Sequence, residues 1–450
     1  MRTENIKHAY FLGIGGIGMS ALARYFMNKG IRISGYDRTS TDLTGELSSE
    51  GASLHFEDNP GQIPEDIDLV IFTPAIPQDL KEFSYLKESG IPMLKRSKVT
   101  GLITKGKTTV AVAGSHGKTS ISSLTAHILK SAGFPATALI GGISRNYSSN
   151  FISSGEEEIM IIEADEFDRS FLELEPDFAI ISAMDPDHLD IYGTADEMEV
   201  SFADFAARIK PNGHLVIRHD LQLPLRTDIH RTGYNVDNLS DAFAYNLQSG
   251  DGYQSFDMFI EGQRITGLKI QIPGRHNVEN AVASSLVCHF LGVGLDQIKQ
   301  GIESFKGVRR RFDVRIRERG LVYIDDYAHH PRELEAFILA VKELYPNRKL
   351  TGLFQPHLFS RTKDFADGFA ASLDLLDEPW LLDIYPAREL PIQGVTSAII
   401  LDRMQNPKKK LMSRKEVLQQ LKKHKPEVFL TMGAGDIDQM VIPVEKALEA

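Results

Sequence analysis

The sequence predicts an α/β fold of three domains, each built on a largely parallel sheet. The chain has 450 residues, and domains of roughly 150 residues are typical, so about three are expected. Short apolar runs alternate with helical stretches, which is the pattern of parallel strands joined by crossover helices. A hydrophobic share of 42% and a charged share of 25% are those of an ordinary folded protein.

The predicted strands fall into three groups. A polar stretch at 105–107 and the basic run at 309–311 mark the boundaries, which gives domains 1–106, 107–307 and 308–450. The middle domain has strand-like runs between glycine turns over residues 213–272, which predict an antiparallel addition. The clearest predicted strands are His8–Leu12, Ile31–Tyr36, Leu69–Thr73, Thr109–Ala113, Ile159–Glu163, Phe178–Ala183, Leu321–Asp325, Leu350–Phe354, Trp380–Ile384 and Val428–Met432.

Composition excludes several classes of protein. There are 50 Lys and Arg residues against 61 Asp and Glu residues, and the net charge of −11 argues against nucleic acid as a partner. The single cysteine, Cys288, can form no internal disulfide. No run approaches the roughly 18 apolar residues of a membrane span, and the polar N-terminus does not resemble a signal peptide. We therefore expect a cytoplasmic protein with no membrane partner.

A glycine-rich turn follows the first predicted strand and precedes a helical stretch at 19–28. Its GxGxxG pattern consists of Gly13, Gly15, Gly16 and Gly18, and Asp37 ends the next strand. Such glycines let backbone N–H groups approach a pyrophosphate at a helix N-terminus. The pattern predicts a diphosphate site, for which a nicotinamide dinucleotide and a UDP-sugar are both candidates. A tight turn without a ligand is the structural alternative.

A second glycine loop lies between the predicted strand at 109–113 and a helical stretch at 121–130. Backbone N–H groups of such a loop cradle phosphates, Lys118 would neutralise the β and γ phosphates, and the Thr119 hydroxyl would bind Mg²⁺. The usual spacing would place glycine at Val112, so the loop is a shortened variant. We predict nucleoside triphosphate binding by Gly114, Ser115, His116, Gly117, Lys118, Thr119 and Ser120.

Acidic segments follow two of the predicted strands of the middle domain, at 163–166 and 185–190. Carboxyl ends of parallel strands meet at one edge of a sheet, so these acids should face the phosphate loop. Mg²⁺ prefers oxygen ligands, which favours Glu163 as a metal ligand. His188 taken alone is more typical of a structural histidine.

Nine motifs follow one another along nearly the whole chain. They are GIGGIGMSALA at 13–23, AGSHGKTS at 113–120, EADEFDRSFL at 163–172, PDHLD at 186–190, PGRHNVENA at 273–281, GVRRRF at 307–312, IDDYAHHP at 324–331, FQPHLFSRT at 354–362 and PIQGVTS at 391–397. In this order they resemble the Mur ligases, cytoplasmic ATP-dependent enzymes that build the peptide stem of bacterial cell-wall precursors. The resemblance implies a UDP-binding Rossmann-like domain, a central P-loop ATPase domain and a C-terminal Rossmann-like domain.

The resemblance also implies an ADP-forming carboxylate–amine ligase. It is closest to the members that join L-alanine to the lactyl carboxylate of UDP-N-acetylmuramate through an acyl phosphate, with Mg²⁺, or manganese in its place, as the cofactor. The implied partners are UDP-N-acetylmuramate, L-alanine and ATP, and we expect a monomer or weak homodimer. Two alternatives stay open. One is a recycling ligase that attaches a stem tripeptide to the same UDP-sugar, and the other is a nicotinamide-dependent dehydrogenase, which would leave Lys118, Thr119 and Glu163 without a purpose.

Residue roles carried over from the family extend the predicted site. Glu163 and His188 would join Thr119 as magnesium ligands, and Asn277 and Asn280 would contact adenine. The third domain would supply ATP and amino-acid contacts from Asp326, Tyr327, His329, His357 and Arg361. A histidine pKa lies near working pH, so His329 is a candidate proton acceptor.

Three positions depart from the family pattern. Leu358 stands where many members carry a second arginine, so we expect the alanine carboxylate to depend mainly on Arg361. No lysine occurs over 191–203, where related ligases carry a carbamylated lysine, so that metal bridge should be absent or replaced. Ser115 replaces a commoner threonine and keeps the hydroxyl.

Overall fold

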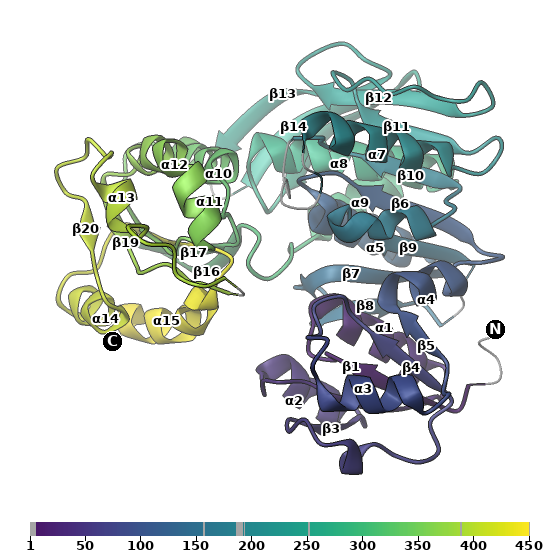
Figure 1. The fold of residues 1–450 in the computed structure, drawn as a ribbon. Helices are drawn as coiled ribbons and strands as arrows, with labels where there is room; N and C mark the ends of the chain where they lie inside the picture. Colours follow the sequence, from purple (N-terminus) through teal and green to yellow (C-terminus); the bar gives the residue numbers. More distant parts are fainter. Residues whose placement is uncertain are drawn as a thin grey trace. The chain divides into compact units, whose positions relative to one another are not determined.

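The structure is a computed structural model that describes residues 6–155, 158–185, 192, 194–250, 253–387 and 389–449 (Figure 1). The chain forms two compact units. The first contains Met1–Tyr245, Asp257–Leu268 and Glu279–Phe305, and the second contains Asn246–Phe256, Lys269–Val278 and Lys306–Ala450.

Five parallel strands form the N-terminal sheet, in the order β3-β2-β1-β4-β5. Strand β1 is buried along its whole length because it lies in the middle of this sheet. In such a sheet, ligands bind beyond the carboxyl ends of the strands, where the strand order reverses, which is here beside β1. The elements are β1 (His8–Leu12), α1 (Ile17–Asn28), β2 (Arg32–Tyr36), α2 (Asp42–Ser49), β3 (Ser53–His55), β4 (Leu69–Phe72), α3 (Lys81–Glu88), β5 (Met93–Lys95) and α4 (Arg96–Ile103).

The central sheet has ten strands, in the order β15-β14-β13-β12-β11-β10-β6-β9-β7-β8. Strand β6 consists of small and β-branched residues and lies between the parallel strands β9 and β10. Helix α1 of the N-terminal sheet packs against β7 and β8 (Figure 1). The elements are β6 (Thr108–Ala113), α5 (Lys118–Ser131), β7 (Ala136–Ser144), β8 (Ser149–Ser153), β9 (Ile159–Glu163), β10 (Phe178–Ile181), α7 (Ala195–Ala207), β11 (His214–Arg218), β12 (His230–Val236), β13 (Ala242–Gly250), β14 (Tyr253–Ile260), β15 (Gln263–Ile270), α8 (Arg275–Phe290) and α9 (Leu295–Ser304).

The antiparallel part of this sheet differs from the prediction for residues 213–272. Strands β11 and β12 lie in that range but continue the parallel sheet, and β12 also pairs with β13 in parallel. Only two residues separate β13 from β14 and β14 from β15, a connection that antiparallel neighbours alone can have. At the opposite edge, β8 runs antiparallel to β7. The sequence did not predict β8, because its segment SNFIS is too polar to give a strong strand signal.

Six strands form the C-terminal sheet, in the order β16-β17-β21-β18-β19-β20, and all pairs except the antiparallel β16 and β17 are parallel. Helices cover an apolar core on this sheet. The elements are β16 (Asp313–Glu318), β17 (Leu321–Asp326), α10 (Pro331–Leu344), β18 (Leu350–Phe354), α11 (Phe359–Asp364), α12 (Ala366–Leu373), β19 (Glu378–Leu381), α13 (Ala398–Leu401), β20 (Lys410–Leu411), α14 (Arg414–Lys423), β21 (Val428–Met432) and α15 (Val441–Glu449).

The predicted fold class, three α/β parts with parallel sheets, is confirmed. Four predicted strands, at 8–12, 159–163, 350–354 and 428–432, have the same bounds in the structure. The strand predicted at 380–384 instead begins two residues earlier, as β19. Within the described ranges, no helix is both long enough and apolar enough to span a bilayer.

Candidate active site

The N-terminal glycine turn joins β1 to α1. Gly13 has φ +81°, a conformation that glycine adopts without steric cost. The Gly15 N–H donates to Asp37 Oδ2 at 2.8 Å, and the Thr39 N–H donates to Asp37 Oδ1 at 3.1 Å. Asp37 therefore stabilises the conformation of the turn. The sequence predicted only a ligand contact for this residue.

The first turn of α1 is suited to an anion. Gly16 caps the helix without a side-chain hydrogen bond, and the first turn contains no acidic residue. The first backbone N–H groups of a helix have no partner within the helix, and its dipole favours negative charge there. The backbone of this turn is therefore compatible with a diphosphate, and ligand binding by the predicted glycines stays a prediction.

The phosphate loop begins after β6. Gly114 and Gly117 have φ of +132° and +86°. A side chain at Gly114 would collide with Ser182, and one at Gly117 would reach the amide oxygen of Asn280, so both positions require glycine. Asn280, predicted to contact adenine, therefore lies directly against the loop.

Contacts from the segment after β10 hold the loop in place. The Ser115 N–H donates to the Ala183 carbonyl at 3.0 Å, and Ser115 Oγ donates to the Asp185 carbonyl at 2.7 Å. The His116 ring lies 3.5 Å from the Asp185 carboxylate. Ser120 lies in the first turn of α5 and is partly buried.

Lys118 lies at the start of α5 and is held at three points. Its ammonium group donates to the Gly114 carbonyl at 2.8 Å and to both oxygens of Glu166, at 2.9 and 2.7 Å. Burial by itself would lower the pKa of Lys118, but the charges of Glu166 and Asp165 outweigh that effect and raise it. Lys118 is thus a positively charged side chain held in a fixed position where the loop meets α5.

Glu163 ends β9, beside the strand that leads into the loop. Its Oε1 accepts from the Thr119 hydroxyl at 3.0 Å, and its Oε2 accepts from the Gly141 N–H at 2.7 Å. Burial raises the pKa of Glu163, against the opposing charge of Lys118. A side chain at Gly141 would collide with this carboxylate, so β7 forms a close backbone cradle for it.

Thr119 and Glu163 supply oxygen donors, the type that Mg²⁺ prefers, and they fit a site that shares the ion with substrate phosphates. His188 lies outside the described residues. Among the residues that are described, no group of three or more His, Cys, Asp and Glu side chains could hold a metal by itself.

Asn277 lies in the first turn of α8 and is buried. Its side-chain amide donates to the Pro273 carbonyl at 3.0 Å, which ties it to the start of the helix. An adenine contact from this residue stays a prediction.

In the second unit, Asp326 ends β17. Its two oxygens accept from the Phe312 and Ala328 N–H groups, both at 2.7 Å. Burial raises the pKa of Asp326 to about 7, although Arg311 opposes the shift. The Asp326 side chain thus stabilises the turn after β17. Its contact with ATP stays a prediction.

The other predicted residues of the second unit lie together. The His329 ring is 5.3 Å from the Tyr327 ring and 6.3 Å from the His357 ring, measured between centroids. Arg361, on α11, is close enough for its charge to act on the pKa of His329. These residues, from the loop after β17 and from the segment 357–361, form one polar cluster with a cation.

The contacts of His329 indicate which of its ring nitrogens carries the hydrogen. Its Nδ1 lies 3.0 Å from the Tyr327 carbonyl, which can only accept, so Nδ1 carries the hydrogen and Nε2 is the basic atom. Burial lowers the pKa of His329, which keeps the imidazole neutral at neutral pH.

Leu358, one of the three departures from the family pattern, is 8% exposed and caps α11 with φ +70°. A positive φ is uncommon for a residue other than glycine and is strained. Its N–H donates to the Tyr385 carbonyl at 3.0 Å, which helps to hold this conformation.

Comparison with known proteins agrees with this geometry. The Mur ligase family catalytic domain matches residues 8–108, the Mur ligase middle domain matches 112–288, and the Mur ligase glutamate ligase domain matches 310–435. The chain belongs to the Mur ligase family. This Mur ligase is 47% identical to a UDP-N-acetylmuramate–L-alanine ligase of Flavobacterium johnsoniae, with 100% of this chain and 99% of the relative covered. It is also 47% identical to a protein of the same name from Parabacteroides distasonis, with 100% and 98% covered.

Solved structures of other Mur ligases have the same fold. The UDP-N-acetylmuramate-alanine ligase of Thermotoga maritima has a TM-score of 0.83 and 27% identity, and 98% of each chain is covered. A murein peptide ligase of Psychrobacter arcticus has a TM-score of 0.70 and 20% identity, with 98% of each chain covered, which shows a shared fold.

Two charged residues of this Mur ligase are missing from the set predicted by sequence. Glu166 lies in the predicted acidic segment, but only the fold shows that it pairs with Lys118. Arg96 begins α4, and its guanidinium lies beside Gly18, where a side chain would collide with it. Arg96 also lies 4.0 Å from Asp165, so it adds positive charge between the glycine turn and the acidic segment. No sequence signal connects Arg96 with a glycine 78 residues away, because only the packing of α4 against α1 brings them together.

Proposed function

We propose that this Mur ligase joins L-alanine to the lactyl carboxylate of UDP-N-acetylmuramate, with ATP converted to ADP and phosphate. The observation that carries the proposal is the 47% identity to ligases of this name over their whole length. The phosphate loop supports ATP as the co-substrate, and a dehydrogenase would have no use for Lys118 bound to Glu166. We also propose the domain boundaries near 106 and 307, a cytoplasmic location and a monomer or weak homodimer.

The first step activates the carboxylate. The lactyl carboxylate attacks the γ-phosphorus of ATP, an acyl phosphate forms and ADP leaves. Lys118 uses its three N–H donors on Gly114 and Glu166, so a phosphate oxygen that binds it takes the place of one of these acceptors. Thr119 and Glu163 would hold Mg²⁺, which supplies charge stabilisation to the transferring phosphoryl group when bound.

The second step forms the amide. The neutral amine of alanine attacks the acyl carbon, and phosphate leaves. The amine must lose a proton, and His329 Nε2 is the unprotonated ring atom that could take it. Arg361 would bind the alanine carboxylate, beside the His329 and His357 rings.

A substrate panel tests the proposed function. Purified protein, ATP, Mg²⁺ and UDP-N-acetylmuramate are mixed with alanine, glycine, serine, glutamate or the stem tripeptide, and ADP and the product mass are measured. We expect the amide product to form fastest with alanine. Product with the tripeptide alone would identify a recycling ligase instead.

Gly15→Val should weaken binding of the UDP-sugar. A Cβ at this position would lie 2.9 Å from both the Asp37 carboxylate and the Thr44 methyl group, so the cradle must shift. We expect the KM for UDP-N-acetylmuramate to rise at least about tenfold, as for the loss of one charge-assisted hydrogen bond, while the KM for ATP stays within twofold. Gly45→Val is the matched control, because a Cβ at Gly45 meets no atom within 4 Å. Equal changes for both substrates would count against a UDP-sugar site at this turn.

Arg361→Met should weaken binding of alanine. A hydrogen bond to a charged group contributes roughly 1.5–3 kcal/mol, which corresponds to about one to two powers of ten in the KM for alanine. The KM values for ATP and UDP-N-acetylmuramate should hardly change. Arg403→Met, which removes an exposed arginine paired with Asp367, is the control. An unchanged KM for alanine would contradict the assignment of Arg361 and favour the larger peptide substrate.

A further inference from the structure

Asn150 on β8 is buried in the contact between the central sheet and helix α1. Its side-chain nitrogen donates to the Ile17 carbonyl at 2.7 Å and to Ser20 Oγ at 2.8 Å. Its side-chain oxygen accepts from Arg24 at 2.5 Å. Both N–H groups and the oxygen of this amide are therefore used, and all three contacts are to α1.

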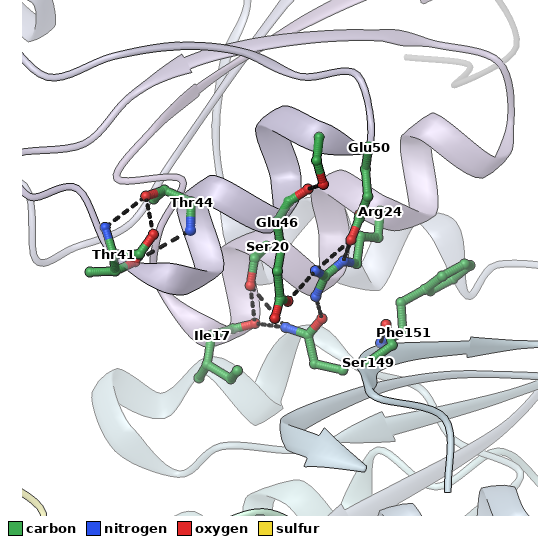
Figure 2. Close-up of polar contacts among 11 residues, drawn as sticks. Ile17, Ser20, Arg24, Thr41, Thr44, Glu46, Glu50, Ser149 and Phe151 are labelled. Carbon is green, nitrogen blue, oxygen red and sulfur yellow. Dashed lines mark hydrogen bonds and ion pairs between the residues drawn. The ribbon is translucent and has the colours of Figure 1, made fainter. Parts of the chain in front are cut away.

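Arg24 extends the contact to helix α2. The arginine side chain is 5% exposed and pairs with Glu46 at 3.0 Å and with Glu50 at 2.7 Å (Figure 2). A buried guanidinium requires such partners, because an unpaired buried charge is strongly unfavourable. The group formed by Asn150, Arg24, Glu46 and Glu50 is a fully paired polar cluster inside the first unit, and we call it the Asn150 cluster.

The Asn150 cluster acts on the helix turn that follows the diphosphate cradle. Ile17 is the first residue of α1, directly after Gly16, so the bond from Asn150 fixes the direction of the turn whose N–H groups face the diphosphate site. Ser20, one turn later, gives a second point of attachment.

Strand β8 and its neighbour β7 also contact the part of the site near the phosphate loop. Strand β8 pairs with β7, and the ladder between them is irregular from Leu139 to Ser144. Gly141 lies in this irregular stretch and donates its N–H to Glu163, which in turn accepts from Thr119. One two-stranded ribbon thus contacts both the first turn of α1 and the acid at the phosphate loop.

We propose that Asn150 is a positioning residue for the ligase reaction: it sets the glycine turn, and with it the bound UDP-sugar, relative to the phosphate loop. The inference rests on the proposed function, since it concerns the alignment of the lactyl carboxylate with the γ-phosphorus. An asparagine suits this place because it donates twice to α1 while it accepts from Arg24. Reacting atoms must be held about 3–3.5 Å apart and aligned, and a displacement of roughly 1 Å can lower the rate about 100-fold.

Asn150→Asp is the sharpest test, because a carboxylate still accepts from Arg24 but cannot donate to Ile17 and repels its carbonyl oxygen. We expect kcat for amide formation to fall about 30- to 100-fold. The dissociation constants of UDP and of ATP, measured separately by calorimetry, should change less than threefold, because the variant shifts the glycine turn relative to the phosphate loop and replaces no residue of either. Tyr25→Phe is the matched control, since it removes another polar contact of α1, to Lys107 at 3.3 Å, far from Ile17, and should leave kcat within twofold.

A kcat within threefold of the original would overturn the proposal. The proposal would also be overturned if kcat and the melting temperature both fell while the dissociation constants of UDP and ATP both rose, because that pattern indicates a purely structural effect. If Asn150→Asp does not fold, Asn150→Ala is judged by the same criteria. Failure of the unmodified protein to form product with alanine would instead contradict the proposed function, independently of Asn150.

Discussion

Lys118→Met should abolish ATP turnover. The ammonium group is a cation held at the phosphate loop. In the proposed mechanism, its removal leaves the transferring phosphoryl group without that charge. Cationic contacts of this kind accelerate phosphoryl transfer by about 10³-fold or more. We expect ADP formation to fall by at least this factor, while the dissociation constant of UDP stays unchanged, because the glycine turn at 13–18 does not involve Lys118.

Two further variants distinguish an effect of Lys118→Met on the reaction from an effect on folding. Lys98→Met removes an exposed lysine that pairs with Glu173 at 3.4 Å, and it should leave turnover unchanged. Lys118→Met by itself leaves the Glu166 carboxylate, 1% exposed, without its cation, at a cost of about 3–5 kcal/mol in the free energy of unfolding. The double variant Lys118→Met/Glu166→Gln should recover stability but not activity. Normal ADP formation by either Lys118 variant would show that the loop does not bind the transferred phosphate.

Glu163→Gln should lower kcat strongly and leave the protein as stable as before or more stable. Burial raises the pKa of Glu163, so the folded state binds this proton more tightly than the unfolded chain. The ionised side chain therefore lowers stability at pH values above its folded pKa, and a neutral amide removes that cost. Glutamine can still accept from the Gly141 N–H, but it is a much weaker ligand for Mg²⁺.

For this variant, we expect kcat to fall about 10²-fold or more at saturating ATP, because a metal ion supplies several kcal/mol of charge stabilisation. Half-maximal activity should also require more Mg²⁺. Calorimetric melting at pH 7.5 should show a temperature equal to or above that of the original protein. Glu173→Gln, at an exposed carboxylate on the same unit, should change neither quantity. A melting temperature well below the original would show that Glu163 is needed for folding.

The sequence by itself determined the local framework of the site. This framework consists of short-range patterns, each made of a strand, a turn that needs glycine and a helix. The patterns include the glycines at 13–18 and 114–117, the Lys118-Thr119 pair and the acid at the end of β9. Such patterns are local in the chain, so periodicity and spacing reveal them. The motif order also indicated the family, and the comparisons confirmed it.

Only the tertiary structure decided which partners these residues have. Four contacts join segments that lie 22 to 133 residues apart in the chain. They are Glu166 with Lys118, Gly141 with Glu163, Arg96 with Gly18, and Asn150 with the first residue of α1. Strand β8 is polar and gave no strong signal, yet it carries Asn150, because its pairing with β7 and its burial under α1 compensate for weak strand propensity. Contacts of this kind depend on which strands become neighbours in a sheet and on what packs over them, and neither is encoded in any one short stretch of sequence.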